Sequence, residues 1–261
     1  MSEGTAAPLR TERRGPILIL TLDRPEARNT ITPGLLVALG RAVLDAEADP
    51  QLRAVVLTAS GERTFCAGMD LRATGDDFAA AMRDEEAAAG FAKLLHGELS
   101  LPVVGAAGGS AVAGGLELLL GCDLIVASSE ARFGLPEVKR GLIPGGNGTL
   151  LAARIPLANA LELVLTGESI SAARALEIGL VNRVVPPAEV LTTALALAER
   201  IAANGPLAVA AARELVRLGA TDLEAARRQT AERAPGLFAS ADAQEGARAY
   251  LEKREPVWKK R

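Results

Sequence analysis

Hydrophobic residues fall in short runs along the first 186 positions, and glycine, proline or polar residues bound each run. Short runs rich in Val, Ile and Leu between such residues are typical of buried β-strands. They predict strands at 16–22, 53–59, 101–109, 123–128 and 181–186, with a short extended piece at 131–138.

Helical spacing of apolar residues occurs between these strands. Thr32 and Pro33 are a typical N-cap and first helical residue, and they predict a helix that runs to about Ala48. Helical spacing with mixed charge covers 77–99, and another helix follows Gly114. Strand, glycine-rich loop and helix therefore recur in order, which favours an α/β fold with βα units and a mostly parallel sheet.

The chain after residue 186 has no strong strand pattern, and its apolar spacing predicts helices. Asn204-Gly205-Pro206 interrupts the helical pattern and marks a boundary. We expect a loose tail at 1–14, a core domain at 15–203 and a C-terminal helical region at 204–261. Within these limits, helices are predicted at 188–203, 206–218, 222–233 and 241–254.

Composition excludes several classes of protein. A hydrophobic content of 49% is enough for a large core, whereas a net charge of −3 provides no basic field to attract nucleic acid or an anionic membrane. The longest apolar stretch, 111–127, contains Glu117 and Asp123 and is therefore not a membrane span. The N-terminus has no apolar signal-peptide core, so we expect a cytoplasmic protein.

Ligands for metal or disulfide chemistry are few. Cys66 and Cys122 have no metal-ligand spacing, and we expect each to be a small buried side chain in a reducing compartment. His96 is the only histidine, so we expect no metal site. A serine hydrolase would need His96 as base and Ser110 as nucleophile, but His96 lies in an unrelated helical segment.

Glu117 is the one carboxylate in the apolar run VAGGLELLLG. Gly114 begins the predicted helix, where unpaired backbone N–H groups favour negative charge. Glu117 lies three residues further on, about 4.5 Å along the axis and on the same face. It either acts on a ligand bound at this helix end or only complements the positive end of the helix dipole.

Glu137 is a second candidate acid, in the segment FGLPEVKRGLIPGG. The alternative is a surface glutamate beside Lys139 and Arg140. Two acids near one anion-binding helix end can share a water, one orienting it while the other exchanges protons. The glycine-rich loops match neither a P-loop, a dinucleotide-binding loop nor a GxSxG nucleophile elbow.

Five segments resemble the enoyl-CoA hydratase (crotonase) family in order and spacing, from about residue 15 to 258. They are FCAGMDL, PVVGAAGGSAVAGGLELLLGCDLIVAS, ARFGLPEVKRGLIPGGNGTLLAARIP, LTGESISAARALEIGLVNRVV and EGARAYLEKREPVW. The resemblance implies a crotonase-like spiral of repeated ββα units with a C-terminal helical trimerisation region, commonly assembled as a dimer of trimers. It also implies an acyl-CoA thioester as substrate, with coenzyme A as part of that substrate and no separate cofactor.

The resemblance implies roles for individual residues. The backbone N–H groups of Met69 and Gly114 correspond to an oxyanion hole, Glu117 and Glu137 to the two hydratase acids, and Gly145 to the backbone that helps to place the water. We expect Glu137 to transfer the proton at carbon 2 and Glu117 to hold and activate the water.

Coenzyme A contacts are expected from three segments of the chain. For the charged residues among them, the alternative is a solvated surface charge, and for Asp70 a helix cap. The expected contact residues are Arg24, Ala27, Arg28, Ala67, Asp70, Leu71, Arg72, Tyr250 and Lys253.

The sequence departs from the family pattern at a glycine triplet, which reads Ala113-Gly114-Gly115. We expect this alanine to be tolerated unless its position requires a left-handed backbone.

The presence of both acids favours an enoyl-CoA hydratase, which adds water across the 2,3-double bond of a trans-2-enoyl-CoA to give a 3-hydroxyacyl-CoA. A related lyase or dehydratase, or an isomerase that works with one base, is the alternative within the family. An alternative of a different class is a non-catalytic scaffold that binds acyl-CoA or RNA. The intact acids argue against a dead enzyme, and the net charge of −3 argues against RNA.

Overall fold

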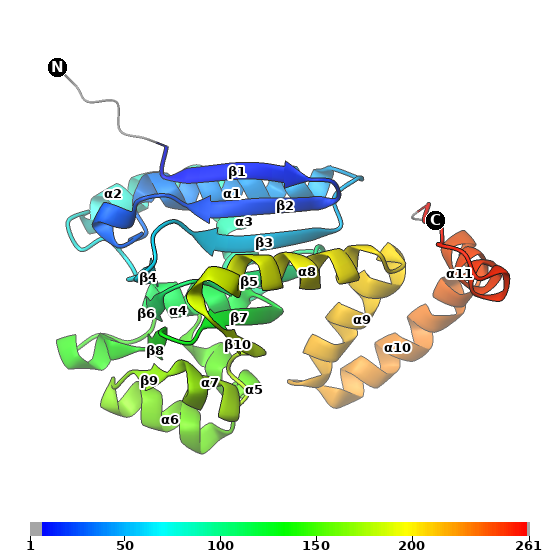
Figure 1. Ribbon diagram of the computed structural model, residues 1–261. Helices are drawn as coiled ribbons and strands as arrows, with labels where there is room; N and C mark the ends of the chain where they lie inside the picture. The colour runs from blue at the N-terminus through cyan, green and yellow to red at the C-terminus, as the bar shows by residue number, and fades with distance from the viewer. Residues whose placement is uncertain (1–6, 260–261) are drawn as a thin grey trace. The chain divides into compact units, whose positions relative to one another are not determined.

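The computed structural model describes residues 7–259 (Figure 1). Contacts between residues divide the chain into two units, the first ending at Ala198 and the second beginning at Glu199. This boundary falls inside helix α8 (Val190–Ala202). The sequence predicts the boundary a few residues later, at Asn204. No helix in the described part of the chain is long and apolar enough to cross a membrane.

The larger sheet of the first unit has the order β1-β2-β3-β5-β7-β10. Its strands are β1 (Leu9–Arg14), β2 (Ile17–Leu22), β3 (Ala54–Ala59), β5 (Val103–Ala107), β7 (Leu124–Ser128) and β10 (Arg183–Val185). β1 and β2 pair antiparallel, and all other neighbours are parallel. The central strands are buried on both faces, which explains why the sequence presents them as unbroken apolar runs.

A second sheet has the order β4-β6-β8-β9 and consists of short strands. They are β4 (Thr64–Cys66), β6 (Ser110–Val112), β8 (Arg132–Gly134) and β9 (Ile170–Ser171). Each of β4, β6 and β8 is the next strand after one of the larger sheet, so successive turns of the chain add one strand to each sheet (Figure 1). The expected spiral of ββα units is confirmed.

Helices connect and cover the turns of the spiral. Thr32 caps α1 (Pro33–Ala48) by accepting the Leu35 N–H at 3.2 Å, and α1 packs against α3 (Glu85–His96). The core below them consists mainly of Leu, Val, Ile and Ala side chains, with Phe65 and Phe133 fully buried. The remaining elements of this unit are α2 (Gly75–Ala81), α4 (Gly114–Gly121), α5 (Leu151–Arg154), α6 (Leu157–Thr166), α7 (Ala172–Glu177), and the 3₁₀ helices η1 (Pro25–Ala27), η2 (Pro136–Arg140), η3 (Gly148–Leu150) and η4 (Pro187–Glu189).

Two expectations about the elements are wrong. Within the expected loose tail 1–14, residues 9–14 form β1, while residues 1–6 lie outside the described residues. β1 is an edge strand held by backbone pairing, with nearly all its side chains exposed, so no apolar pattern marks it. The helix expected at 77–99 is divided into α2 and α3, because the Asp84 carboxylate caps α3 at the Ala87 N–H and binds Arg41.

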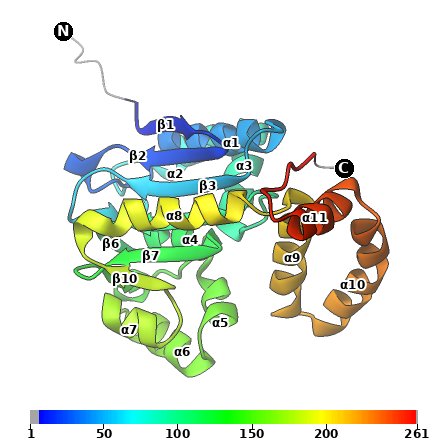
Figure 2. The same ribbon diagram turned by 45° about the vertical axis from the view of Figure 1, so that its right-hand side comes forward.

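The second unit consists mainly of α9 (Pro206–Gly219), α10 (Leu223–Phe238) and α11 (Ala241–Glu252), drawn from yellow to red in Figure 2. α9 and α10 pack against each other, and the last described residues contact the start of the unit. There, Trp258 Nε1 donates to the Ala203 carbonyl at 2.8 Å, and Arg254 pairs with Glu245 at 2.6 Å. The C-terminal segment therefore ties the ends of this unit together.

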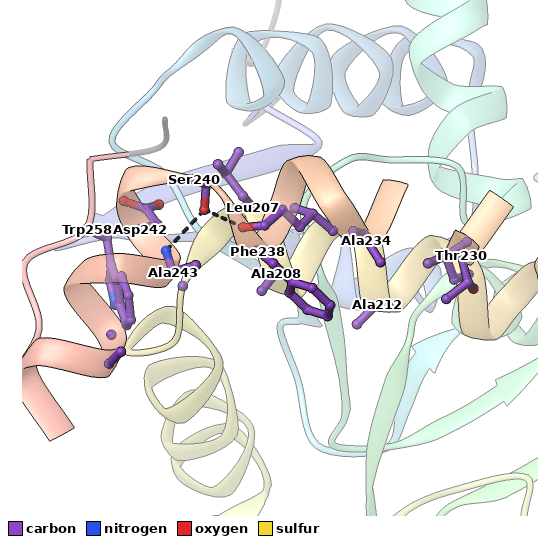
Figure 3. A pocket seen from close by; sticks show the side chains of 16 residues that line it. Leu207, Ala208, Ala212, Thr230, Ala234, Phe238, Ser240, Asp242, Ala243 and Trp258 are labelled. Carbon is purple, nitrogen blue, oxygen red and sulfur yellow. Dashed lines mark hydrogen bonds between the residues drawn. The ribbon is translucent and has the colours of Figure 1, made fainter. Parts of the chain in front are cut away.

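A pocket of about 410 Å³ lies inside the second unit (Figure 3). Leu207 of α9, with Ala234 and Phe238 of α10, contributes to its mainly apolar lining, and Trp258 belongs to it as well. Ser240 also lines the pocket and caps α11 by accepting the Ala243 N–H at 3.1 Å.

Candidate active site

Close contact between α4 and β4 forms the centre of the site. A Cβ atom at Gly115 would lie 2.1 Å from the Cys66 carbonyl oxygen, so only glycine allows the first turn of α4 to approach β4 this closely. The approach places Gly114 beside Gly68 and Met69, since a Cβ at Gly114 would lie 3.7 Å from the Met69 nitrogen. Two residues that are 45 positions apart in the chain therefore become neighbours.

The backbone around Met69 leaves its N–H available. Ile31 donates to the Gly68 carbonyl at 2.8 Å and accepts the Asp70 N–H at 2.9 Å, so the hydrogen bonds pass on either side of Met69. Across residues 7–259, neither the Met69 N–H nor the Gly114 N–H, at the first position of α4, has a protein acceptor. Two neighbouring free N–H groups are what an oxyanion hole requires.

Ala113, directly before α4, has a φ of 52° and a ψ of −133°. This is the backbone conformation that favours glycine, and an alanine here stores local strain. The sequence predicts that the alanine is tolerated unless its position requires a left-handed backbone. The structure places Ala113 in a positive-φ conformation, so this exception applies here.

Glu117 lies on the first turn of α4 with only 5% of its surface exposed. Its Oε1 atom accepts three backbone N–H groups, from Gly146, Asn147 and Gly148, at 2.9, 2.6 and 2.9 Å. Consecutive N–H groups that converge on one oxygen form an anion-binding nest. The nest fixes one oxygen of Glu117 as an acceptor, and Oε2 has none of these three bonds.

Glu137 lies in η2, after β8, and is half-buried. Its Oε2 atom is buried and has no hydrogen-bond partner within the described chain. Burial raises the pKa of Glu137, and the negative charge of Glu117 raises it further. The two predicted acids therefore lie near enough to interact, and the raised pKa of Glu137 favours its protonated form.

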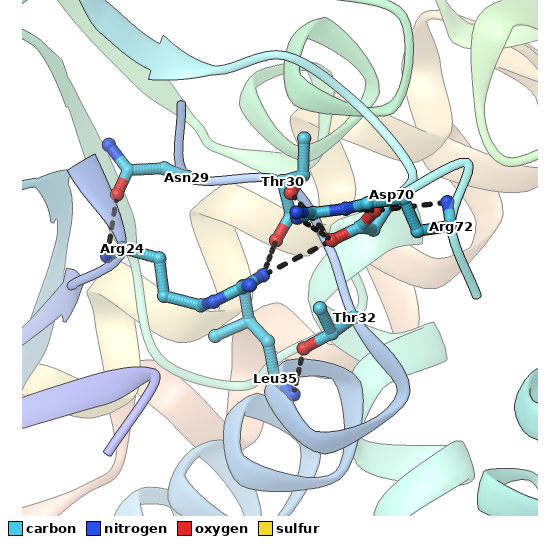
Figure 4. Close-up of polar contacts among 7 residues, drawn as sticks. All are labelled: Arg24, Asn29, Thr30, Thr32, Leu35, Asp70 and Arg72. Carbon is cyan, nitrogen blue, oxygen red and sulfur yellow. Dashed lines mark hydrogen bonds and ion pairs between the residues drawn. The ribbon is translucent and has the colours of Figure 1, made fainter. Parts of the chain in front are cut away.

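A buried carboxylate stabilises the loop that carries Met69 (Figure 4). Asp70 accepts hydrogen bonds from Arg72 Nε and Nη2 at 2.9 and 2.8 Å and from the Thr30 hydroxyl at 3.2 Å, and Arg24 lies 3.5 Å away. The hydrogen bonds from Arg72 hold the pKa of Asp70 well below its usual range, despite the opposing effect of burial. Its carboxylate oxygens bind groups of the protein itself, and it does not cap a helix.

The other expected coenzyme A contacts fall into two groups. Arg24, Arg28 and Ala67 lie in the region of Asp70, since the Ala67 N–H donates to the Arg28 carbonyl at 3.1 Å. Ala27 ends η1 directly before Arg28, and Leu71 and Arg72 follow Asp70, with Leu71 80% exposed. Tyr250 and Lys253 belong to the second unit, where Tyr250 is 84% exposed and Lys253 ends α11 in a left-handed conformation.

The sequence did not reveal the nest around Glu117. The expected water-placing residue, Gly145, is exposed, and the N–H groups that reach Glu117 come from the next three residues. Backbone donors have no side-chain signature, and the glycines of the segment PGGNG were the only available signal. The role of Gly145 stays a prediction.

Other nucleophiles are unsuited to chemistry here. Burial raises the pKa of Cys66 to about 12, and Cys122 is buried as well. The Ser110 hydroxyl accepts the Arg132 N–H at 3.0 Å, whereas His96 lies at the end of α3. Within the described residues, no group of three His, Cys, Asp or Glu side chains is arranged to hold a metal ion.

Known proteins share this fold across nearly the whole chain. Residues 12–261 match a family model described as enoyl-CoA hydratase/isomerase. A carnitinyl-CoA dehydratase of Salmonella enteritidis is 40% identical, covering 97% of this chain and 98% of the relative. An enoyl-CoA hydratase structure from Mycobacterium tuberculosis is 39% identical with a TM-score of 0.87, covering 98% and 100% of the two chains. A carnitinyl-CoA hydratase structure from Mycobacterium avium is 42% identical with a TM-score of 0.74 and the same coverage.

The chain therefore belongs to the enoyl-CoA hydratase/isomerase family, and its spiral of ββα units is the crotonase fold.

Proposed function

We propose that the protein is an enoyl-CoA hydratase, adding water across the 2,3-double bond of a trans-2-enoyl-CoA. The observation that carries this proposal is the pair of interacting acids, Glu117 and Glu137, in a site with two free N–H groups on neighbouring segments. An isomerase needs only one base, so the second acid favours hydration. The family match and the names of the relatives support acyl-CoA chemistry of this kind.

In the proposed reaction, the thioester oxygen binds the N–H groups of Met69 and Gly114. Addition of water at carbon 3 moves electron density from the double bond onto this oxygen, which becomes enolate-like. Donors already positioned there stabilise the developing charge, typically by about 3–4 kcal/mol for each donor. The site residues thereby lower the barrier without a separate cofactor.

The two acids divide the proton transfers. Glu117, with Oε1 held by the nest, accepts a proton from the attacking water, whose oxygen forms the new bond to carbon 3. Glu137, whose raised pKa favours the protonated form, donates a proton to carbon 2. Carbon 3 thus gains the hydroxyl group of the water and carbon 2 gains the proton of Glu137. Glu117 then loses its new proton to solvent and Glu137 takes one up, so the net reaction consumes one water and restores both acids.

Dehydration of a carnitinyl-CoA is a second candidate, because relatives named for carnitinyl-CoA reach 40% and 42% identity. Carnitine is a 3-hydroxy acid, so loss of its hydroxyl as water is the reverse of the same addition. The proposed acids and oxyanion hole serve both directions. The two candidates differ in the acyl group of the substrate, because a carnitinyl group carries a quaternary ammonium.

We also propose that coenzyme A binds along the loop 67–72 and the neighbouring residues 24–28. Arg28 and Arg72 are both exposed, but Arg72 pairs with Asp70 at 2.8 Å. The Arg24 guanidinium also pairs with Asp70 and donates to the Thr30 carbonyl at 3.3 Å, so among the described residues Arg28 is the cation of this group that has no ion pair. A solvated guanidinium next to the loop suits the phosphates of coenzyme A. Contacts from Tyr250 and Lys253 stay predictions.

A panel of acyl-CoA esters tests the assignment. We expect hydration of crotonyl-CoA or a longer 2-enoyl-CoA. Faster turnover of the carnitine-linked ester than of these esters would favour the second candidate.

Glu117→Gln and Glu137→Gln keep the shape of the side chain but remove a base, so each is expected to lower the hydration rate by roughly 10²–10⁴-fold while ester binding is retained. Deuterium exchange at carbon 2 should decrease most in Glu137→Gln. Hydration at nearly the wild-type rate by either variant would contradict the two-acid mechanism.

A further inference from the structure

The nest that holds Glu117 depends on how the short segment 144–148 is fixed in space. Pro144 contacts this segment from within, since a Cβ at Gly148 would lie 2.5 Å from the Pro144 Cβ. A Cβ at Gly146 would lie 2.9 Å from Glu117 Oε2, so the segment also approaches Glu117 closely. A displacement of these residues would move three donors at once, because the N–H groups come from consecutive residues.

Asn147 has the only polar side chain among these five residues, and 4% of the residue is exposed. It occupies the N-cap position of η3, where asparagine normally bonds to the first turn of its own helix. Its side chain makes no such bond. The Asn147 Nδ2 group donates instead to the carbonyl of Leu95, in the last turn of α3.

The Leu95 carbonyl is an acceptor that α3 itself does not satisfy. The carbonyls at the end of a helix lack partners within the helix. At the end of α3, the Gly97 and Glu98 N–H groups bond to the Leu94 and Lys93 carbonyls, at 3.2 and 2.8 Å. The neighbouring Leu95 carbonyl receives the buried amide of Asn147. Removing this amide leaves a poorly solvated carbonyl and frees the loop from α3.

We propose that Asn147 is a positioning residue for the acid Glu117. Its side chain joins the glycine loop to α3, and its backbone N–H makes the shortest of the three bonds to Glu117 Oε1, at 2.6 Å. The side chain does not touch the reacting atoms, but it determines where the nest holds Glu117 and therefore how Oε2 is presented to water. This inference rests on the proposed hydratase mechanism.

Two substitutions test the proposal. Asn147→Ala removes the side chain, and Asn147→Asp keeps its shape but replaces the donor with an oxygen that repels the Leu95 carbonyl. We expect both to lower kcat for enoyl-CoA hydration by about 100-fold, with KM within about threefold, because a small misplacement of a catalytic group has effects of this order. Thr58→Val is the matched control, since it removes another buried side-chain bond, to the Ala106 carbonyl at 3.1 Å, inside the larger sheet.

Stability and hydrogen exchange separate positioning from a merely structural role. If the Asn147 variants resemble Thr58→Val, with a lower melting temperature but wild-type kcat at 25 °C, the proposal is overturned. Amide exchange of 144–151 in the free protein should be faster in Asn147→Ala than in wild type or Thr58→Val, and unchanged exchange would overturn the proposal too.

If neither variant folds, the wild-type amides of Asn147 and Gly148 must exchange more slowly than that of Gly145. Equal rates contradict the proposal. A wild-type protein that hydrates no ester contradicts the proposed function instead, and the exchange data still decide whether Asn147 holds the loop.

Discussion

Ala113, directly before α4, is an L-residue in a backbone conformation that favours glycine. Strain of this type costs about 1–3 kcal/mol, whereas a glycine loses about 0.5–1 kcal/mol of chain entropy. We expect Ala113→Gly to raise the free energy of unfolding by about 1 kcal/mol in urea titrations and to keep activity within a few-fold. Ala111→Gly is the control, because it removes a buried methyl from β6 and should destabilise. A destabilised Ala113→Gly would show that position 113 is not strained.

Glu137 makes stability depend on pH in a defined direction. Its pKa is raised in the folded state by burial and by Glu117, so the folded protein binds this proton more tightly than the unfolded chain does. The associated stability is present below the unfolded pKa, and it is lost as the pH rises through the folded pKa. The ionised form, which is populated above the folded pKa, is therefore a source of instability.

Glu137→Gln removes this loss of stability at high pH, because glutamine does not ionise. Calorimetry at pH 8 should give a higher melting temperature for Glu137→Gln than for wild type, because the variant has no charge to bury at this position. The difference should vanish below about pH 4, where an ordinary glutamate is protonated. The exposed Glu130→Gln is the control and should change neither value. An equal gain at both pH values would contradict the assignment of the instability to the charge of Glu137.

At the level of elements, Gly115 determines how closely α4 approaches β4. A Cβ there would meet the Cys66 backbone at 2.1 Å, which cannot move as a flexible side chain does. We expect Gly115→Ala to reduce stability by about 1–3 kcal/mol and to lower kcat, because Gly114 and Met69 would separate. Gly34→Ala in α1, with nothing within 4 Å, should be neutral or slightly stabilising. Equal urea midpoints for the two variants would refute this role of Gly115.

The elements that the sequence predicts are those with enough buried residues to show a pattern. β2, β3, β5 and β7 contain continuous apolar runs, and the Thr32 cap marks the start of α1. β4 and β6 have three residues each inside glycine-rich segments, which is too short for any period to appear. These short strands nevertheless bring the two N–H groups together.

The site could be predicted only in part for a related reason. The resemblance points to Glu117 and Glu137, because side chains occur at recognisable positions in motifs. The nest at 146–148 and the contact of Asn147 with Leu95 depend on backbone groups and on residues 52 positions apart. No local pattern in this sequence encodes that distance.

At the scale of the whole molecule, the second unit exposes several large apolar side chains. Phe238 is 78% exposed, and Val216 and Leu223 are also exposed on α9 and α10. Large exposed apolar groups on neighbouring helices favour contact with another surface. Together with the trimer implied by the family resemblance, they predict self-association through the second unit.

Phe238→Asp places a charge on that surface and should convert the assembly to smaller species, as measured by light scattering after size-exclusion chromatography at several concentrations. Met82→Asp, at an exposed apolar residue of the first unit, is the control and should leave subunit number unchanged. Trp258 is the only tryptophan and is held in the second unit by its bond to Ala203, so its fluorescence reports whether that unit stays folded in Phe238→Asp. A folded Phe238→Asp with the wild-type subunit number, or a wild-type monomer, would refute association through this surface.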